Sequence, residues 1–148
     1  MHFIMLSYQL MEHSGDETFD LRKMIADYME GGLLDNIIDM FKHDEDLYVH
    51  IAALLTDERM RVRLGAAILV ESLAEQFPEN IPKVIPHIIP LLKDQNPVTR
   101  GDAAYLVGKI GKQDVIRHLE EMADDEDPNV QSIAREAIEE IRAASKPV

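Results

Sequence analysis

Three stretches of the chain repeat one pattern, and this repeat limits the possible folds more than any other feature. They are LYVHIAALLTDERMRVRLGAAILVESL from residue 47, VIPHIIPLLKDQNPVTRGDAAYLVGKI from 84 and VIRHLEEMADDEDPNVQSIAREAIEEI from 115. The stretches align without gaps, and their starts are offset by 37 and 31 residues. A repeat unit of this length cannot bury its apolar face alone, so successive units are expected to stack on one another.

Each unit predicts two helices, because its apolar residues recur with the 3.6-residue period of an α-helix. The first helix of the middle unit has one apolar stripe, made of Val84, Ile85, Ile88, Leu91 and Leu92. Pro86 and Pro90 lie inside this helix and predict a kink, since proline removes a backbone donor. An Asp- and Pro-containing turn leads to the second helix, whose central alanines let helices approach closely.

The repeats also indicate how the rest of the sequence is divided. The expected divisions are residues 1–18 as a further helix or a disordered start, 19–43 as a capping helix pair, 46–76, 81–111 and 113–143 as repeats, and 144–148 as a tail. Terminal repeats of such stacks are atypical because they cap the core, which is why 19–43 fits the motif poorly. Residues 19–143 are therefore expected to form a single domain.

The core motif of each unit resembles that of HEAT repeats. It reads DERMRVRLGA, DQNPVTRGDA and DEDPNVQSIA in the three units. The 31-residue spacing is closest to the HEAT-like repeats named after phycobilisome lyases, and the resemblance covers about residues 46–143. It implies an all-α fold, a right-handed α-α superhelix (a HEAT-like solenoid) of about four helix pairs. The fold alone says little about function, because one fold serves many functions.

Acidic and basic residues recur at aligned positions in and after the turn. They are Asp57, Asp94 and Asp125 at the turn, and Arg63 and Arg100 one helical turn later. A carboxylate at the turn can accept backbone N–H groups where the next helix starts. The resemblance to HEAT repeats implies that these residues form a hydrogen-bonded ladder between adjacent repeats, which Gln131 interrupts in the last unit. The alternative is a surface that offers the two arginines to a carboxylate of a partner.

His50, His87 and His118 share one aligned position, at the boundary of the apolar stripe. Equivalent residues of stacked helices lie about 10 Å apart, whereas zinc–nitrogen bonds measure about 2.0–2.1 Å. The three histidines are therefore expected to pack as individual side chains, and a pH-sensitive seam between repeats is the open alternative. We predict no metal site, no cofactor and no catalytic residue.

Charge and composition narrow the classes of partner. The chain has 28 acidic and 15 basic residues and a net charge of −13, which disfavours nucleic acid and anionic membranes because phosphate binding needs clustered Lys and Arg. No cysteine is present, so disulfides and thiol nucleophiles are excluded, and a cytoplasmic location is expected. The sequence also lacks the His-Glu dipeptides of diiron HEAT-like hydroxylases and the basic, aromatic groove of HEAT-like DNA glycosylases.

The second helices contain the candidate partner-binding residues. Residues 59–119 hold 9 bases and 6 acids between two acidic ends. The candidates face away from the expected core and are Leu64, Ile68, Glu71, Tyr105, Lys109 and Glu136. We expect a non-enzymatic interaction module, monomeric or weakly oligomeric, that binds another protein through the concave ridge of second helices. The alternatives are an accessory subunit or small lyase-related enzyme that binds a small molecule, and a self-associating structural unit.

Overall fold

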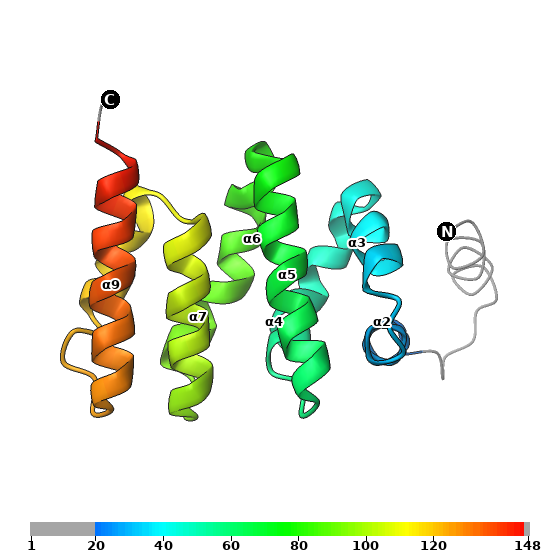
Figure 1. The fold of residues 1–148 in the computed structure, drawn as a ribbon, viewed down its shortest axis with the longest axis horizontal. Coiled ribbons are helices and arrows are strands. Elements are labelled where there is room, and N and C mark those ends of the chain that lie inside the picture. Colours follow the sequence, from blue (N-terminus) through cyan, green and yellow to red (C-terminus); the bar gives the residue numbers. More distant parts are fainter. Residues whose placement is uncertain (1–19, 147–148) are drawn as a thin grey trace. The chain divides into compact units, whose positions relative to one another are not determined.

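The computed structural model describes residues 20–146, and these are helical throughout their regular structure (Figure 1). The predicted all-α class is therefore confirmed. The chain separates into two compact units, of which the first ends at Leu69 and the second begins at Val70. The expected helix or disordered start at residues 1–18 lies outside the described residues, as does the end of the tail, 147–148.

The first unit begins with a helix pair, α2 (Leu21–Glu30) and α3 (Leu34–His43). Asp20 caps α2, because its carboxylate accepts a hydrogen bond of 3.1 Å from the backbone N–H of Lys23. Gly32 joins the two helices with a φ of +90°, a conformation that residues with a Cβ rarely adopt. The two glycines between the helices thus set a tight connection within the predicted capping pair.

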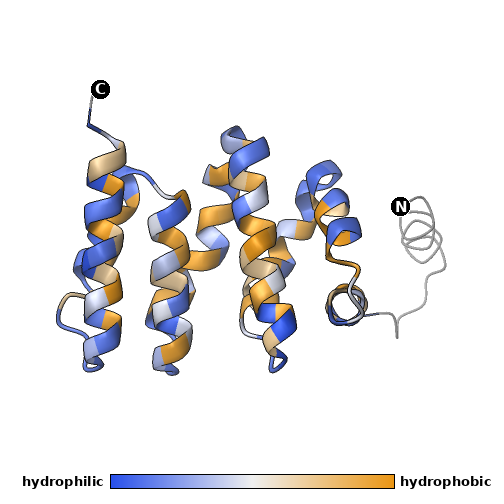
Figure 2. Cartoon of the chain, viewed as in Figure 1, coloured by the Kyte–Doolittle hydropathy of each residue, from blue (hydrophilic) through white to orange (hydrophobic). Residues whose placement is uncertain are grey.

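The first repeat follows as η1 (Glu45–His50), α4 (Ile51–Leu55) and α5 (Met60–Gln76). From Val70 onward, α5 belongs to the second unit. The buried core of the first unit takes side chains from all its helices and consists of Ile25, Ala26, Met29, Ile37, Ile38, Met40, Phe41, Leu47, Tyr48, Ile51, Leu54, Val62, Ala66 and Leu69. Figure 2 shows hydrophobic and hydrophilic residues alternating along the helices, as this one-sided burial requires.

The second unit holds the other two repeats. Its elements are the end of α5, then η2 (Pro78–Asn80), α6 (Ile81–Ile88), η3 (Ile89–Lys93), α7 (Pro97–Ile110), η4 (Gln113–Val115), α8 (Ile116–Glu120) and α9 (Pro128–Ala144). Helices α7 and α9 pack side by side (Figure 1). The packing is close because Gly108 faces Ala137, where a Cβ on Gly108 would lie 2.6 Å from the Cβ of Ala137.

The first helices of the repeats are broken into short pieces. In the middle repeat, α6 ends at Ile88 and the chain continues as the 3-10 helix η3. Pro86 and Pro90 lack the N–H groups that would continue the α-helical ladder, so the kink they predict takes the form of a change to 3-10 geometry. In the other two repeats the α-helical part, α4 or α8, is only five residues long.

Candidate functional site

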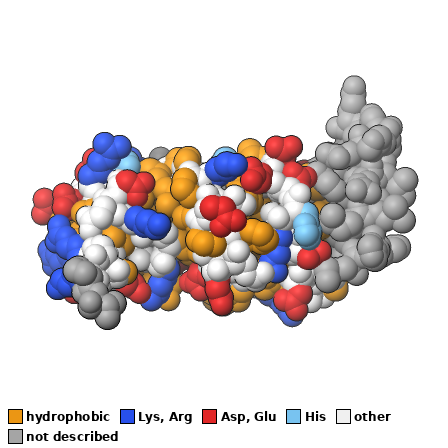
Figure 3. Space-filling model, turned by 90° about the horizontal axis from the view of Figure 1, so that it is seen from above, with side chains coloured by type: hydrophobic (Ala, Val, Ile, Leu, Met, Phe, Trp, Pro, Cys, Tyr) orange, Lys and Arg blue, Asp and Glu red, His pale blue; other side chains and the backbone are white. Residues whose placement is uncertain are grey.

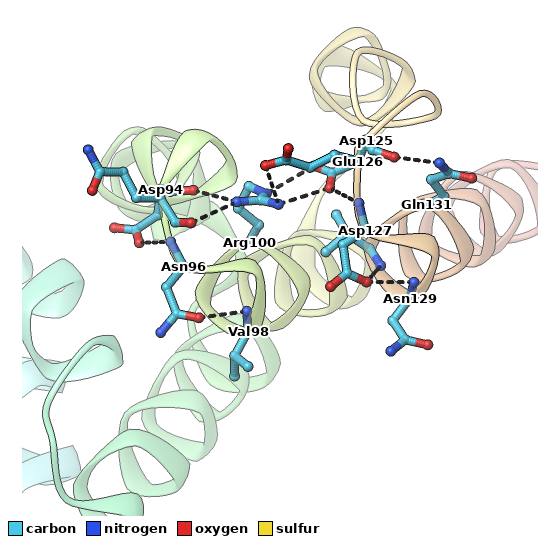
Figure 4. Close-up of polar contacts among 11 residues, drawn as sticks. Asp94, Asn96, Val98, Arg100, Asp125, Glu126, Asp127, Asn129 and Gln131 are labelled. Carbon is cyan, nitrogen blue, oxygen red and sulfur yellow. Dashed lines mark hydrogen bonds and ion pairs between the residues drawn. The ribbon is translucent and has the colours of Figure 1, made fainter.

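The turn between the two helices has the same hydrogen bond in all three repeats. An aspartate accepts from the backbone N–H two residues later at 2.9 Å, and the pairs are Asp57 with Arg59, Asp94 with Asn96, and Asp125 with Asp127. Asn96 then caps α7, because its side chain accepts from the N–H of Val98 at 2.9 Å (Figure 4). Asp127 caps α9 in the same way. The aligned aspartates therefore order the turn just before each helix cap.

Arg100 connects this turn in the second repeat with the turn in the third (Figure 4). Its Nη1 donates to the carbonyl oxygens of Asp94 and Gln95 at 2.9 and 3.1 Å. Its Nε and Nη2 donate to the two carboxylate oxygens of Asp125, each at 2.9 Å. Arg100 is only 7% exposed, and its hydrogen bonds lower the pKa of Asp125. The guanidinium thus forms a buried, bidentate bridge between repeats.

Within the described residues, the hydrogen bonds of the equivalent side chains in the other two repeats lie in their own turns. Arg63 donates from Nη1 to the carbonyl oxygens of Asp57 and Glu58 at 2.8 and 2.9 Å. Gln131, which stands at this position in the last repeat, donates its side-chain amide to the carbonyl oxygen of Asp125. Its shorter amide therefore replaces the part of the arginine that binds the turn.

Arg59 makes a link in the first unit that the repeat pattern does not predict. Its guanidinium donates to the carboxylate of Asp57 at 3.0 and 3.2 Å and to that of Asp27 on α2 at 2.9 Å. The side-chain hydrogen bonds from Arg59 lower the pKa of Asp57. The aligned positions of the other repeats hold Asn96 and Asp127, so the alignment offers no signal for a basic residue here. Arg59 joins the first repeat to the capping pair.

An apolar stripe lies exposed on α5 in the first unit. Met60, Leu64 and Ile68, which we call the α5 stripe, are 65%, 58% and 49% exposed. Their spacing of four residues puts them on one side of the helix. Two of them are predicted partner-binding residues. The third predicted residue of this helix, Glu71, is exposed but belongs to the second unit.

A second exposed cluster lies on α7 and α9. Tyr105 is 53% exposed, and the Nζ of Lys109 lies 5.2 Å from the centroid of its ring. The same Nζ is 2.6 Å from Oε1 of Glu140, and this contact raises the pKa of Lys109. The carboxylate of the cluster thus comes from Glu140, whereas the predicted Glu136 is exposed one turn earlier on α9. The arrangement presents an aromatic face with a neighbouring cation.

The aligned histidines are half-buried at three separate positions. His50 lies in the first unit, and His87 and His118 lie in the second. Burial lowers the pKa of His50 below its usual value. Across residues 20–146, no three His, Asp or Glu side chains are gathered as they would be to hold a metal ion. The packing of the three histidines as individual side chains stays a prediction.

Comparison with protein families identifies the repeat. A family model described as HEAT repeats matches residues 48–139. The match includes all three aligned turns, the whole of α5 and α7, and α9 as far as residue 139. A comparison with curated proteins finds no match. None of the described helices is long and apolar enough to cross a membrane.

Proposed function

Because the chain belongs to the HEAT repeat family, we propose that it is a non-enzymatic interaction module that binds another protein through its second helices. The α5 stripe carries this proposal. Three large apolar side chains in a row, each about half exposed or more, form a surface that water solvates poorly. A helix held on one side by a buried core presents such a row rigidly, which lowers the entropy cost of binding.

The charges beside the α5 stripe indicate the chemistry of the partner. Arg59 is occupied by two carboxylates, and Arg63 is occupied by backbone carbonyls. Arg61 is exposed on the same helix, and its Nη2 lies 3.4 Å from where a Cβ on Gly32 would be. Its charge therefore lies over the turn between α2 and α3. The favoured partner is an apolar helix or strand with an acidic residue at one end.

A photo-crosslinking experiment tests this proposal. A photoreactive amino acid replaces Leu64 in the full chain, and the protein that crosslinks to it in native cell extract is identified. That protein is then purified, and its affinity for the unmodified chain is measured by titration. The variant Leu64→Asp/Ile68→Asp should weaken its binding at least about tenfold. Val49→Asp is the matched control, because Val49 is a similarly exposed apolar residue on η1 and its variant should bind like the wild type. Equal binding by the stripe variant would overturn the proposal.

Several finer assignments belong to the same proposal. The 31-residue spacing supports a relation to the phycobilisome-lyase type of repeat, and the lack of cysteine supports a cytoplasmic location. The net charge of −13 supports a protein partner over nucleic acid or an anionic membrane. We further propose that Tyr105 and Lys109 make contacts of their own with the partner, and that the chain is monomeric or weakly oligomeric, which light scattering would test.

A further inference from the structure

The second helix of the middle repeat is one turn shorter than its counterparts. Helix α7 has 14 residues, whereas α5 and α9 have 17 each. The three helices start at aligned positions, so α5 and α9 continue beyond the level at which α7 stops at Ile110 (Figure 1). The extra turn of α5 lies after Val70 and is thus part of the second unit. The missing turn leaves space above the end of α7.

Gly111 causes the early end of α7. It caps the helix, and its N–H donates to the carbonyl oxygen of Val107 at 2.8 Å. A Cβ at this position would lie 2.5 Å from Cγ2 of Val115 and 2.6 Å from the same carbonyl oxygen. Only glycine lets the chain turn so closely toward η4.

The space forms a recess of about 810 Å³, which we call the Gly111 recess. Its floor is made by three isoleucines that are almost fully buried, Ile81, Ile110 and Ile141, at 6%, 8% and 3% exposure. Pro82, Ile85 and Ala144 line its sides. Residues of the buried core of the second unit therefore line the recess. Figure 3 looks onto this end of the helices, where hydrophobic side chains reach the surface among charged ones.

The polar groups that line the Gly111 recess differ in whether they are free to bind a ligand. Gln113 and Ser145 are occupied with each other, since Gln113 Nε2 donates to Ser145 Oγ at 3.0 Å. Lys109, Lys112 and Asp114 also line the recess. Lys109 already pairs with Glu140, but a lysine ammonium has further donors. Lys112 and Asp114 are both exposed. The lining thus carries two ammonium groups and one carboxylate, although the whole chain is strongly acidic.

We propose that the Gly111 recess binds an amphipathic carboxylate, with an unbranched apolar chain on the isoleucine floor and its carboxylate at Lys112. The volume falls within the range of about 300–1,000 Å³ that is usual for small-molecule sites. A lining of apolar side chains with a few polar groups is also usual for such sites. The ammonium groups favour an anionic end group over a cationic one. An unbranched alkyl chain can enter the recess, whereas the surface of a partner protein would cover only the opening of the recess.

Binding of decanoate, below its micelle concentration, tests this proposal. Isothermal titration of the full chain should show saturable binding of one decanoate. Lys112→Glu should weaken it about threefold or more, because an attraction becomes a repulsion. Lys93→Glu makes the same charge change at an exposed lysine outside the recess and should leave the affinity unchanged. Decanol and decylammonium should bind more weakly than decanoate.

A bulky side chain placed in the recess distinguishes binding at this site from nonspecific binding of decanoate to other apolar surfaces. Ala144→Trp, or Ile85→Trp if the first variant fails to fold, should abolish saturable binding while the helical circular dichroism signal is retained. The variant Leu64→Asp/Ile68→Asp should still bind decanoate, so failure of the proposed partner surface and failure of this site are distinguishable. Absence of saturable binding to the wild type, or full affinity in a folded tryptophan variant, would overturn the proposal. Equal affinity for decanol would overturn the carboxylate assignment.

Discussion

Arg100 holds the carboxylate of Asp125 with two hydrogen bonds of 2.9 Å, although the two residues are 25 positions apart. The remaining terminal nitrogen of the guanidinium bonds to two carbonyl oxygens of its own turn. One side chain therefore satisfies acceptors in two successive repeats at once. This arrangement depends on the planar fork of the guanidinium, which a lysine ammonium cannot reproduce.

Replacement of Arg100 is expected to be destabilising even when the positive charge is kept. Arg100→Lys and Arg100→Gln should both lower the melting temperature by several degrees, because each leaves buried acceptors without donors. Differential scanning calorimetry measures the change. Arg135→Lys is the matched control, since Arg135 is exposed and donates one hydrogen bond of 3.4 Å. A melting temperature for Arg100→Lys equal to that of the control would contradict the bridging role.

The stability that Asp125 contributes should disappear in acid. Hydrogen bonds from Arg100 lower the pKa of the folded-state carboxyl below its usual value of 3.8. The folded state therefore binds this proton less readily than the unfolded state, and the contribution is present above the unfolded pKa and lost as pH falls through the folded pKa. Urea midpoints of wild type and Asp125→Asn should differ more at neutral pH than at about pH 3. A gap of equal size at both pH values, or one that widened in acid, would contradict the assignment.

His50 should contribute a separate pH dependence at milder acidity. Burial lowers its pKa in the folded state below the usual histidine value of 6.5. Protonation then favours the unfolded state, so stability should fall as pH decreases below that value. His50→Asn should flatten the change in urea midpoint between about pH 7 and pH 5. An unchanged slope in His50→Asn would contradict this prediction.

Two glycines of α7 should respond oppositely to alanine. A Cβ at Gly108 would lie 2.9 Å from the backbone Cα of Ala137, so Gly108→Ala forces α7 and α9 apart and should cost about 1–3 kcal/mol. A Cβ at Gly101 would meet the end of the Ile133 side chain at 3.1 Å and that of Val130 at an ordinary 4.0 Å. The Ile133 side chain can move, and alanine favours the helix by about 1 kcal/mol, so Gly101→Ala should be near neutral or stabilising. Chemical denaturation measures both, and equal losses would contradict the close packing at Gly108.

The repeat period allowed much of the local structure to be predicted. Apolar residues at helical spacing predicted the all-α class, and the predicted turns lead into α7 and α9, which begin at Pro97 and Pro128. The same period places Leu64 and Ile68 away from the core, where the structure has them about half exposed. These features depend on residues within a few positions of one another, so they can be inferred from spacing alone.

Other features were decided only by the tertiary structure. The sequence by itself determined the helical repeats, their turns and the glycine at the end of α7. The partner of Arg59 on α2 and the contact of Gly108 with Ala137 depend on atoms 32 and 29 residues away, and the recess above Gly111 takes lining residues from as far as Ala74 and Ser145. Such contacts follow from the packing distance between neighbouring helices, which no local pattern specifies. The recess, in particular, lies where α7 ends a turn earlier than α9.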